Sequence, residues 1–197
     1  MTNPSTECDL TFVLRSRDDE ELVGHVIGRI ATHLRGLGLR YELLVVDEGS
    51  GDNTLAIAAL LRKQYPELEA LHASPGRGYV VGAERARGRL VVVADVRDEA
   101  PLALLGYALS RAERGTDVVS VAGRLVLFRR TRALRALEAL TTVRRSGASA
   151  RFLSQLRSLG LAVVEVHARR ESFAARVRDR VRDVLAIRRT YLPGARI

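Results

Sequence analysis

Short apolar runs alternate with helix-like segments along most of the chain, and this alternation constrains the fold more than any other feature. Runs typical of strands cover residues 9–14, 41–46, 68–73, 90–94 and 117–121. Between them, helical patterns cover residues 18–36, 54–64 and 101–114, and a shorter one ends before Gly88. The run at 41–46 is continuously apolar, as in parallel strands buried on both faces. Alternating strands and helices with short loops predict an α/β fold with a mostly parallel sheet flanked by helices.

The remaining residues continue this pattern less regularly. Residues 125–128 and 161–166 are predicted strands, whereas residues 131–143, 151–159 and 172–189 are predicted helices. A chain of 197 residues suits one domain with a sizeable core. We therefore expect a single domain over residues 1–197, with a first half at 8–124 and a second half at 125–197.

Charge is divided unevenly between the two parts of the chain. Up to Gly123 there are 14 basic and 18 acidic residues, whereas from Arg124 onward there are 18 basic and 5 acidic ones. In the helix at 172–189, Arg176, Arg178, Arg180 and Arg182 flank an apolar stripe. A basic amphipathic helix of this kind favours contact with an anionic membrane surface or an acidic protein. The alternative without a binding role is a solvated helix face in an arginine-rich chain. The sequence does not favour nucleic acid as the partner.

The compartment is inferred from cysteine usage and from the N-terminus. Cys8 is the single cysteine, so the chain closes no internal disulfide and builds no thiolate metal site. The N-terminus lacks the layout of a signal peptide, and no apolar run is long enough to cross a bilayer. We expect a cytoplasmic protein, with peripheral contact at the membrane as a second possibility.

Polar loops follow the first, second and fourth predicted strands, at residues 15–19, 47–54 and 94–98. In an open parallel sheet, ligands bind beyond the carboxyl ends of the strands. The second loop reads Asp47-Glu48-Gly49-Ser50-Gly51-Asp52-Asn53-Thr54 after Val45-Val46. This stretch resembles the VVDDGSxDNT signature of family 2 glycosyltransferases, which have the GT-A fold. A turn rich in turn-forming residues is the structural alternative.

The resemblance extends over most of the chain in the right order. Gly76-Arg77-Gly78 stands where the family has G-K-G, and residues 86–93 match its A-x-G-D-Y-V-V-F. Glu165 and the helix from Ser172 are similar to polyprenyl-phosphate sugar transferases. The resemblance implies that an acidic pair, here Asp47 and Glu48, contacts the base and ribose of a nucleotide-sugar donor. The nucleotide-binding residues that it implies are Arg15, Asp19, Asp47, Glu48, Gly76, Arg77 and Asp95.

The metal-binding motif of the family is degraded here. The family has D-A-D after the fourth strand, whereas this chain has Ala94-Asp95-Val96. A hard divalent cation needs several oxygen ligands, which Asp95 alone does not supply. We therefore expect no Mg²⁺ or Mn²⁺, with a shifted site at Asp95 and Asp98 as the alternative.

The acceptor side also departs from the family. The family has a long segment between the strands at 117–121 and 125–130, and it carries the catalytic carboxylate; here Gly123 and Arg124 join them. No Q-x-x-R-W motif is present, because the chain has no tryptophan. No catalytic residue is assigned, and a degenerate, non-catalytic binding or regulatory module is the preferred interpretation. An active glycosyltransferase acting on a phosphorylated or membrane-borne acceptor is the alternative.

A third interpretation comes from the glycines after the third strand. Gly76-Arg77-Gly78 with Gly82 also resembles a dinucleotide-binding turn, with Asp95 at the end of the next strand. That motif normally opens the first βα unit, whereas two units precede it here. A dinucleotide-binding protein is therefore kept as the second alternative.

Overall fold

The computed structural model describes residues 8–98, 100–132, 154 and 156–167. Its strands are β1 (Leu10–Ser16), β2 (Tyr41–Asp47), β3 (Leu68–His72), β4 (Leu90–Asp95), β5 (Val118–Val121), β6 (Leu125–Arg129) and β7 (Val163–Val166). Its helices are α1 (Glu20–Gly36), α2 (Thr54–Leu61), α3 (Gly78–Arg85), the short 3-10 helix η2 (Leu102–Leu104) and α4 (Leu105–Glu113).

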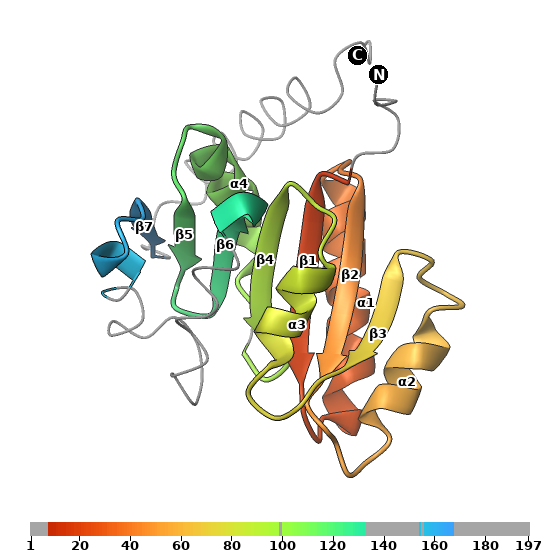
Figure 1. Ribbon diagram of the computed structural model, residues 1–197. Coiled ribbons are helices and arrows are strands. Elements are labelled where there is room, and N and C mark those ends of the chain that lie inside the picture. Colours follow the sequence, from red (N-terminus) through yellow and green to blue (C-terminus); the bar gives the residue numbers. More distant parts are fainter. Residues whose placement is uncertain (1–7, 99, 133–153, 155, 168–197) are drawn as a thin grey trace, which may run out of the picture.

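The strands form one seven-stranded sheet in the order β3-β2-β1-β4-β6-β5-β7 (Figure 1). Strands β1 to β4 are mutually parallel, and β5 is parallel to β7. Strand β6 lies between β4 and β5 and is antiparallel to both. The predicted α/β domain with a mostly parallel sheet is confirmed.

Both faces of the sheet are covered, which explains the continuous apolar runs. Leu10, Phe12 and Leu14 of β1 join a core cluster with α1, α2 and α4, whereas Val13 joins a second cluster with α3. Figure 1 shows α3 in front of the sheet and α1 behind it. Because side chains alternate across a strand, a strand covered on both faces is apolar at most positions rather than at every second one.

Several strands run further than the apolar patterns indicated: β2 continues to Asp47 rather than Val46, and β6 continues to Arg129 rather than Phe128. Strand β1 continues to Ser16 rather than ending at Leu14, and β4 continues to Asp95 rather than Ala94. Arg15 pairs in register with Val46 of β2 and with Asp95 of β4. Backbone pairing on both sides therefore holds polar residues in a strand that the apolar pattern alone would have ended.

The helix boundaries also differ from the predictions. Helix α1 begins at Glu20 rather than Asp18, because Asp18 has a φ of 53°, outside the right-handed helical region. Helix α2 ends at Leu61 rather than Gln64. The helix predicted at 101–114 divides into η2 and α4.

A tight turn connects β5 to β6. Ala122 and Gly123 have positive φ values of 51° and 68°, and Arg124 donates its backbone N–H to the carbonyl of Val121. The adjoining residues Val121 and Leu125 pair directly in the antiparallel ladder. The short connection expected at Gly123 and Arg124 is therefore a hairpin turn.

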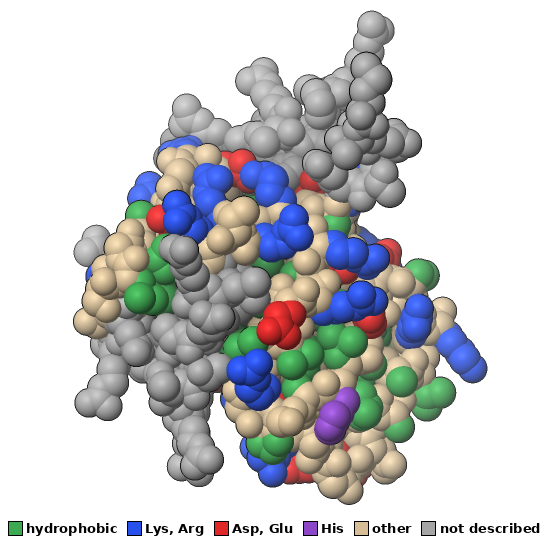
Figure 2. Space-filling model, in the orientation of Figure 1, with side chains coloured by type: hydrophobic (Ala, Val, Ile, Leu, Met, Phe, Trp, Pro, Cys, Tyr) green, Lys and Arg blue, Asp and Glu red, His purple; other side chains and the backbone are tan. Residues whose placement is uncertain are grey.

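Many arginines are exposed on the face that carries α3, above all in the upper half of Figure 2. Several lie at the amino ends of the parallel strands, where the ion pairs are Arg40–Asp9, Arg87–Glu42 and Arg89–Glu113. The Glu42 side chain is only 3% exposed. These arginines therefore compensate buried or partly buried carboxylates.

Part of the second half lies outside the described residues. The helix predicted at 151–159 is described at 154 and 156–159; residues 154 and 156–158 are helical, and residue 159 is in a turn. Most of the helix predicted at 131–143 lies outside the described residues, and so does the whole helix predicted at 172–189. Outside them too are the arginines of that second helix, Arg176, Arg178, Arg180 and Arg182. Within the described part of the chain, no helix combines the length and apolar character needed to span a membrane.

Candidate functional site

The carboxyl ends of β1, β2 and β4 meet at the lower end of the sheet in Figure 1. Ser16 is in register with Asp47, and Arg15 is in register with Asp95. Parallel pairing therefore brings together residues that are far apart in sequence. We call this region the strand-end site.

Arg15 lies at the centre of the strand-end site. Its Nε donates a 2.8 Å hydrogen bond to Oδ2 of Asp95, and its Nη2 donates a second one to the same oxygen. Its Nη1 lies 3.8 Å from Oε2 of Glu48, and its guanidinium carbon is 5.3 Å from the ring centroid of Tyr79. Burial raises the pKa of Tyr79, so the phenol is neutral. One guanidinium thus bridges two carboxylates over an aromatic ring.

Arg97 forms a second cationic centre in the loop after β4. Its Nε donates a 2.6 Å hydrogen bond to Oδ1 of Asp19, whose side chain is 2% exposed. Its Nη2 donates to the carbonyl oxygens of Arg17 and Asp18, at 2.9 and 3.0 Å. Its backbone N–H donates to Oδ1 of Asp95 at 2.9 Å. The Arg97 side chain is nevertheless 63% exposed. These hydrogen bonds therefore fix the guanidinium while part of it stays accessible to solvent.

Glu48 binds the start of α3. Its two carboxylate oxygens accept backbone hydrogen bonds from Gly76 at 3.0 Å and from Gly78 at 2.7 Å. A Cβ at Gly78 would lie 2.7 Å from Oε1 of Glu48 and 3.1 Å from Cγ of Arg15, so only glycine fits this close approach. The amides that a dinucleotide-binding turn would offer to a diphosphate are thus bonded to a side chain of the same protein.

Asp47 stabilises the loop that follows it. Its Oδ2 accepts hydrogen bonds from the backbone N–H groups of Gly49 and Ser50, both at 3.1 Å, and the Ser50 hydroxyl donates to Oδ1. The Asp47 residue is 2% exposed. A turn-stabilising role, which the sequence left open as the structural alternative, is present in the structure.

The Asp52-Asn53-Thr54 part of the loop joins the ends of two helices. Asp52, rather than Asn53, accepts the hydrogen bonds from the backbone and hydroxyl of Thr54. The Thr54 hydroxyl in turn accepts a 2.8 Å bond from the backbone of Asp19, and Glu20 accepts two from Asn53. The loops after β1 and β2 are therefore fixed to each other.

The residues at the usual metal position do not fit a divalent cation. Both oxygens of Asp95 already accept hydrogen bonds, Oδ2 from Arg15 and Oδ1 from the backbone of Arg97. In Asp98, Oδ2 is buried and has no hydrogen-bond partner among the described residues, and burial followed by the charge of Asp95 raises the pKa of its carboxyl. The described residues hold no cluster of three or more His, Cys, Asp or Glu side chains that could bind a metal.

Arg97 and Tyr79 were not among the site residues predicted from the sequence. Arg97 lies within the loop at 94–98, and Tyr79 directly follows Gly78, so both are adjacent to predicted positions. The nearby residues Gly78 and Asp95 belong to the family motifs, whereas Tyr79 and Arg97 do not. Arg77, which was predicted, is the exposed residue preceding α3.

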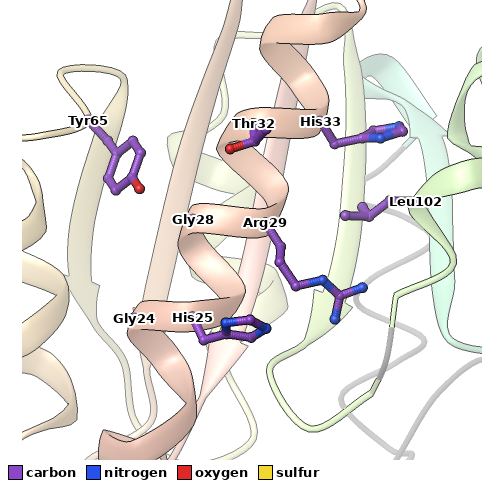
Figure 3. A pocket seen from close by; sticks show the side chains of 8 residues that line it. All are labelled: Gly24, His25, Gly28, Arg29, Thr32, His33, Tyr65 and Leu102. Atoms are coloured by element: carbon purple, nitrogen blue, oxygen red, sulfur yellow. The ribbon is translucent and has the colours of Figure 1, made fainter.

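A depression elsewhere on the molecule does not coincide with the strand-end site. It measures about 620 Å³ and lies along the middle of α1. Figure 3 shows Tyr65 on one side of the helix and His33 and Leu102 on the other, with Gly28 between them. Because these side chains do not converge on one point, we assign no ligand to the depression.

The sequence matches the family model described as Glycosyl transferase family 2 over residues 20–173. A mannosyltransferase from Pyrobaculum calidifontis, solved with GDP-Man and Mn²⁺, has a TM-score of 0.61 and 15% identity, with 100% of this chain and 67% of that chain covered. Glucosyl-3-phosphoglycerate synthase from Mycobacterium tuberculosis, solved with Mn²⁺, UDP and glucosyl-3-phosphoglycerate, has a TM-score of 0.56 and 15% identity, covering 95% and 81%.

A third similar structure is that of a different kind of enzyme. It is 4-diphosphocytidyl-2C-methyl-D-erythritol synthase from Anaerococcus prevotii, with a TM-score of 0.59, 10% identity and coverage of 83% and 90%. At identities this low, the structural similarity shows a common fold and does not extend to the reaction.

Proposed function

Because the chain belongs to glycosyl transferase family 2, we propose that its strand-end site binds a nucleotide or nucleotide sugar and that the chain transfers no sugar by itself. One observation carries the second part: Asp19, Asp47, Glu48 and Asp95 all accept hydrogen bonds from partners within the chain. The protein would then act as a binding or regulatory module.

Nucleotide binding is supported by the position of the site. Ligands of open parallel sheets bind beyond the carboxyl ends of the strands, and the loops after β1, β2 and β4 meet there. Structures with this fold have been solved with GDP-Man or UDP. The residues that we assign to binding are Arg15, Asp19, Asp47, Glu48, Gly76, Arg77 and Asp95.

The lack of transfer is supported by the state of the carboxylates. Transfer to a hydroxyl needs a general base that can accept its proton. Oδ2 of Asp95 already accepts a hydrogen bond from Arg15, and Oδ1 of Asp19 accepts one from Arg97, so guanidinium N–H groups occupy the oxygens that would have to meet an acceptor hydroxyl. The hairpin turn between β5 and β6 also leaves no room for a long acceptor segment at that point.

Titration calorimetry and product analysis test the two parts separately. We expect the full chain to bind GDP or UDP, and incubation with GDP-mannose or UDP-glucose to release no nucleoside diphosphate above the uncatalysed rate. The release assay should include phosphoglycerate and a polyprenyl phosphate as acceptors. Absence of any nucleotide binding would overturn the first part, and acceptor-dependent release of GDP or UDP would overturn the second.

An active transferase is the second candidate, and Asp98 is the observation that favours it. Its pKa is raised, and its buried Oδ2 has no hydrogen-bond partner in the part of the chain that the structure describes; both are properties of a carboxylate that could accept a proton. If acceptor-dependent release is seen, Asp98→Asn should abolish it without changing the Kd for the nucleotide.

A further inference from the structure

The strand-end site has lost its cation ligands but contains two arginines in their place. We infer that the guanidinium groups of Arg15 and Arg97 replace the divalent cation, so that the diphosphate of a nucleotide binds without a metal ion. The inference rests on the proposed nucleotide binding and states which groups recognise the phosphates. The inference follows from the observation that the oxygens of Asp95 already accept hydrogen bonds from these two arginines rather than being free to bind a metal ion.

Arg15 already occupies the place of a cation at Asp95. Two of its nitrogens donate to Asp95 Oδ2, and the other side of that carboxylate accepts the backbone N–H of Arg97. A metal ion at Asp95 would have to displace one of these donors. The Arg15 side chain is still 24% exposed, so a bound anion could reach it from the solvent side.

Arg97 is held in place and still open to a ligand. Its Nε and Nη2 are engaged by Asp19 and by two backbone carbonyls. Its Nη1 donates no hydrogen bond to a described residue, and the side chain is 63% exposed. A guanidinium presents its N–H groups in a planar fork that matches phosphate oxygens.

The backing carboxylates give this arrangement its specificity for a diphosphate. Asp19 and Asp95 fix the two guanidiniums before the ligand arrives, which reduces the entropy lost on binding. They also neutralise part of the charge, so an anion must make direct hydrogen bonds rather than rely on a general positive field. We therefore expect binding to strengthen from nucleoside to monophosphate to diphosphate.

The experiment is titration calorimetry of the full chain with guanosine, GMP, GDP and inorganic pyrophosphate, each in EDTA and in excess Mn²⁺. The Kd for GDP should agree within about twofold between the two conditions. The substitution Arg97→Gln keeps an N–H donor for Asp19 but removes the charge, and it should weaken GDP about tenfold or more, as expected for a lost charge-assisted contact. Arg97→Lys, which keeps the charge without the fork, should lie between.

Matched controls separate binding from folding and from overall charge. Arg62→Ala removes an exposed arginine at the far end of α2 from Thr54, and it should leave the Kd for GDP unchanged. Thermal unfolding of Arg97→Gln checks that the variant is folded at the assay temperature.

The outcomes distinguish this inference from the proposed function. GDP binding that requires Mn²⁺, or that Arg97→Gln leaves unchanged, would overturn the arginine substitution while the proposed nucleotide binding stands. Absence of binding by GDP and by UDP under both conditions would overturn the proposed function and this inference together.

Discussion

At the scale of single residues, Glu48 connects the strand-end loop to α3. Glu48→Gln replaces one of the two oxygens that accept the backbone N–H groups of Gly76 and Gly78 by an N–H donor. Glu48 is 5% exposed and Gly78 is buried, so water cannot reach the Glu48–Gly78 contact to replace a lost acceptor. We expect the free energy of unfolding to fall by about 1–3 kcal/mol, as measured by urea denaturation.

Glu84→Gln is the matched control for that prediction. Glu84 lies in α3, the helix that Glu48 contacts, and is exposed, so the same chemical change should alter the free energy of unfolding by less than about 0.5 kcal/mol. Equal effects of the two substitutions would mean that the Glu48 contacts do not stabilise the start of α3.

Two aspartates should give stability an opposite dependence on pH. Burial and then the charge of Asp95 raise the pKa of Asp98, with Arg124 and Arg15 opposing, so its folded-state pKa lies above its unfolded value. The ionised carboxyl therefore destabilises the fold at neutral pH, and this cost disappears as pH falls through the folded and then the unfolded pKa. We expect Asp98→Asn to be more stable than the wild type at pH 7, with a difference that shrinks as pH falls and vanishes only below the unfolded pKa of about 3.9.

The ionised carboxyl of Asp52 should stabilise the fold, in contrast to that of Asp98. Hydrogen bonds from Thr54 lower the pKa of its carboxyl, so its stabilising effect is present above the unfolded pKa and is lost as pH falls through the folded pKa. Asp52→Asn should therefore be less stable than the wild type at pH 7 and converge with it in acid. Thermal unfolding from pH 3 to 8 measures both variants, and parallel trends would contradict the assignment.

At the scale of elements, Gly82 sets how closely α3 packs on β1. A Cβ at Gly82 would lie 2.3 Å from Cγ1 of Val13, and Val13 is completely buried. Gly82→Ala should therefore destabilise the protein by about 1–3 kcal/mol, as overpacking does. Gly106→Ala in α4, where a new Cβ meets nothing within 4 Å, should instead stabilise it by about 0.4–1 kcal/mol. Urea denaturation distinguishes the two signs.

The elements themselves could be predicted from the sequence, because most buried strands consist mainly of apolar residues, as in the continuous run Leu43–Val46. Their exact ends could not, because Arg15 and Ser16 remain in β1 through pairing with two neighbouring strands. The insertion of β6 between β4 and β5 was also not predictable, since it depends on long-range pairing rather than on a local pattern.

The candidate site could also be predicted only in part. Parallel strand ends meet at one edge, so the sequence could place Arg15, Glu48 and Asp95 together before the structure was available. It could not indicate that these side chains bind one another, because Arg15 and Asp95 are 80 positions apart. Arg97 was missed since its role comes from Asp19, a residue of another loop.

At the scale of the whole molecule, the position of each strand in the sheet should determine how often its hydrogen bonds open. Strand β1 is flanked by β2 and β4, and Leu10, Phe12, Val13 and Leu14 are completely buried. Among the described strands β7 has only β5 as a neighbour, and its Glu165 is exposed. Hydrogen exchange from a buried central strand requires nearly global unfolding, whereas an edge strand can open locally.

We therefore expect the amides of Phe12 to Leu14 to exchange at the rate set by global unfolding, and those of Val163 to Val166 at least about tenfold faster. Native-state exchange followed by NMR or mass spectrometry measures both sets in one sample. Adding urea well below the unfolding transition should accelerate β1 more than β7, because global opening exposes more surface than local opening. Equal protection of the two strands would mean that β7 is not an edge in solution and is covered by a part of the chain outside the described residues or by another molecule.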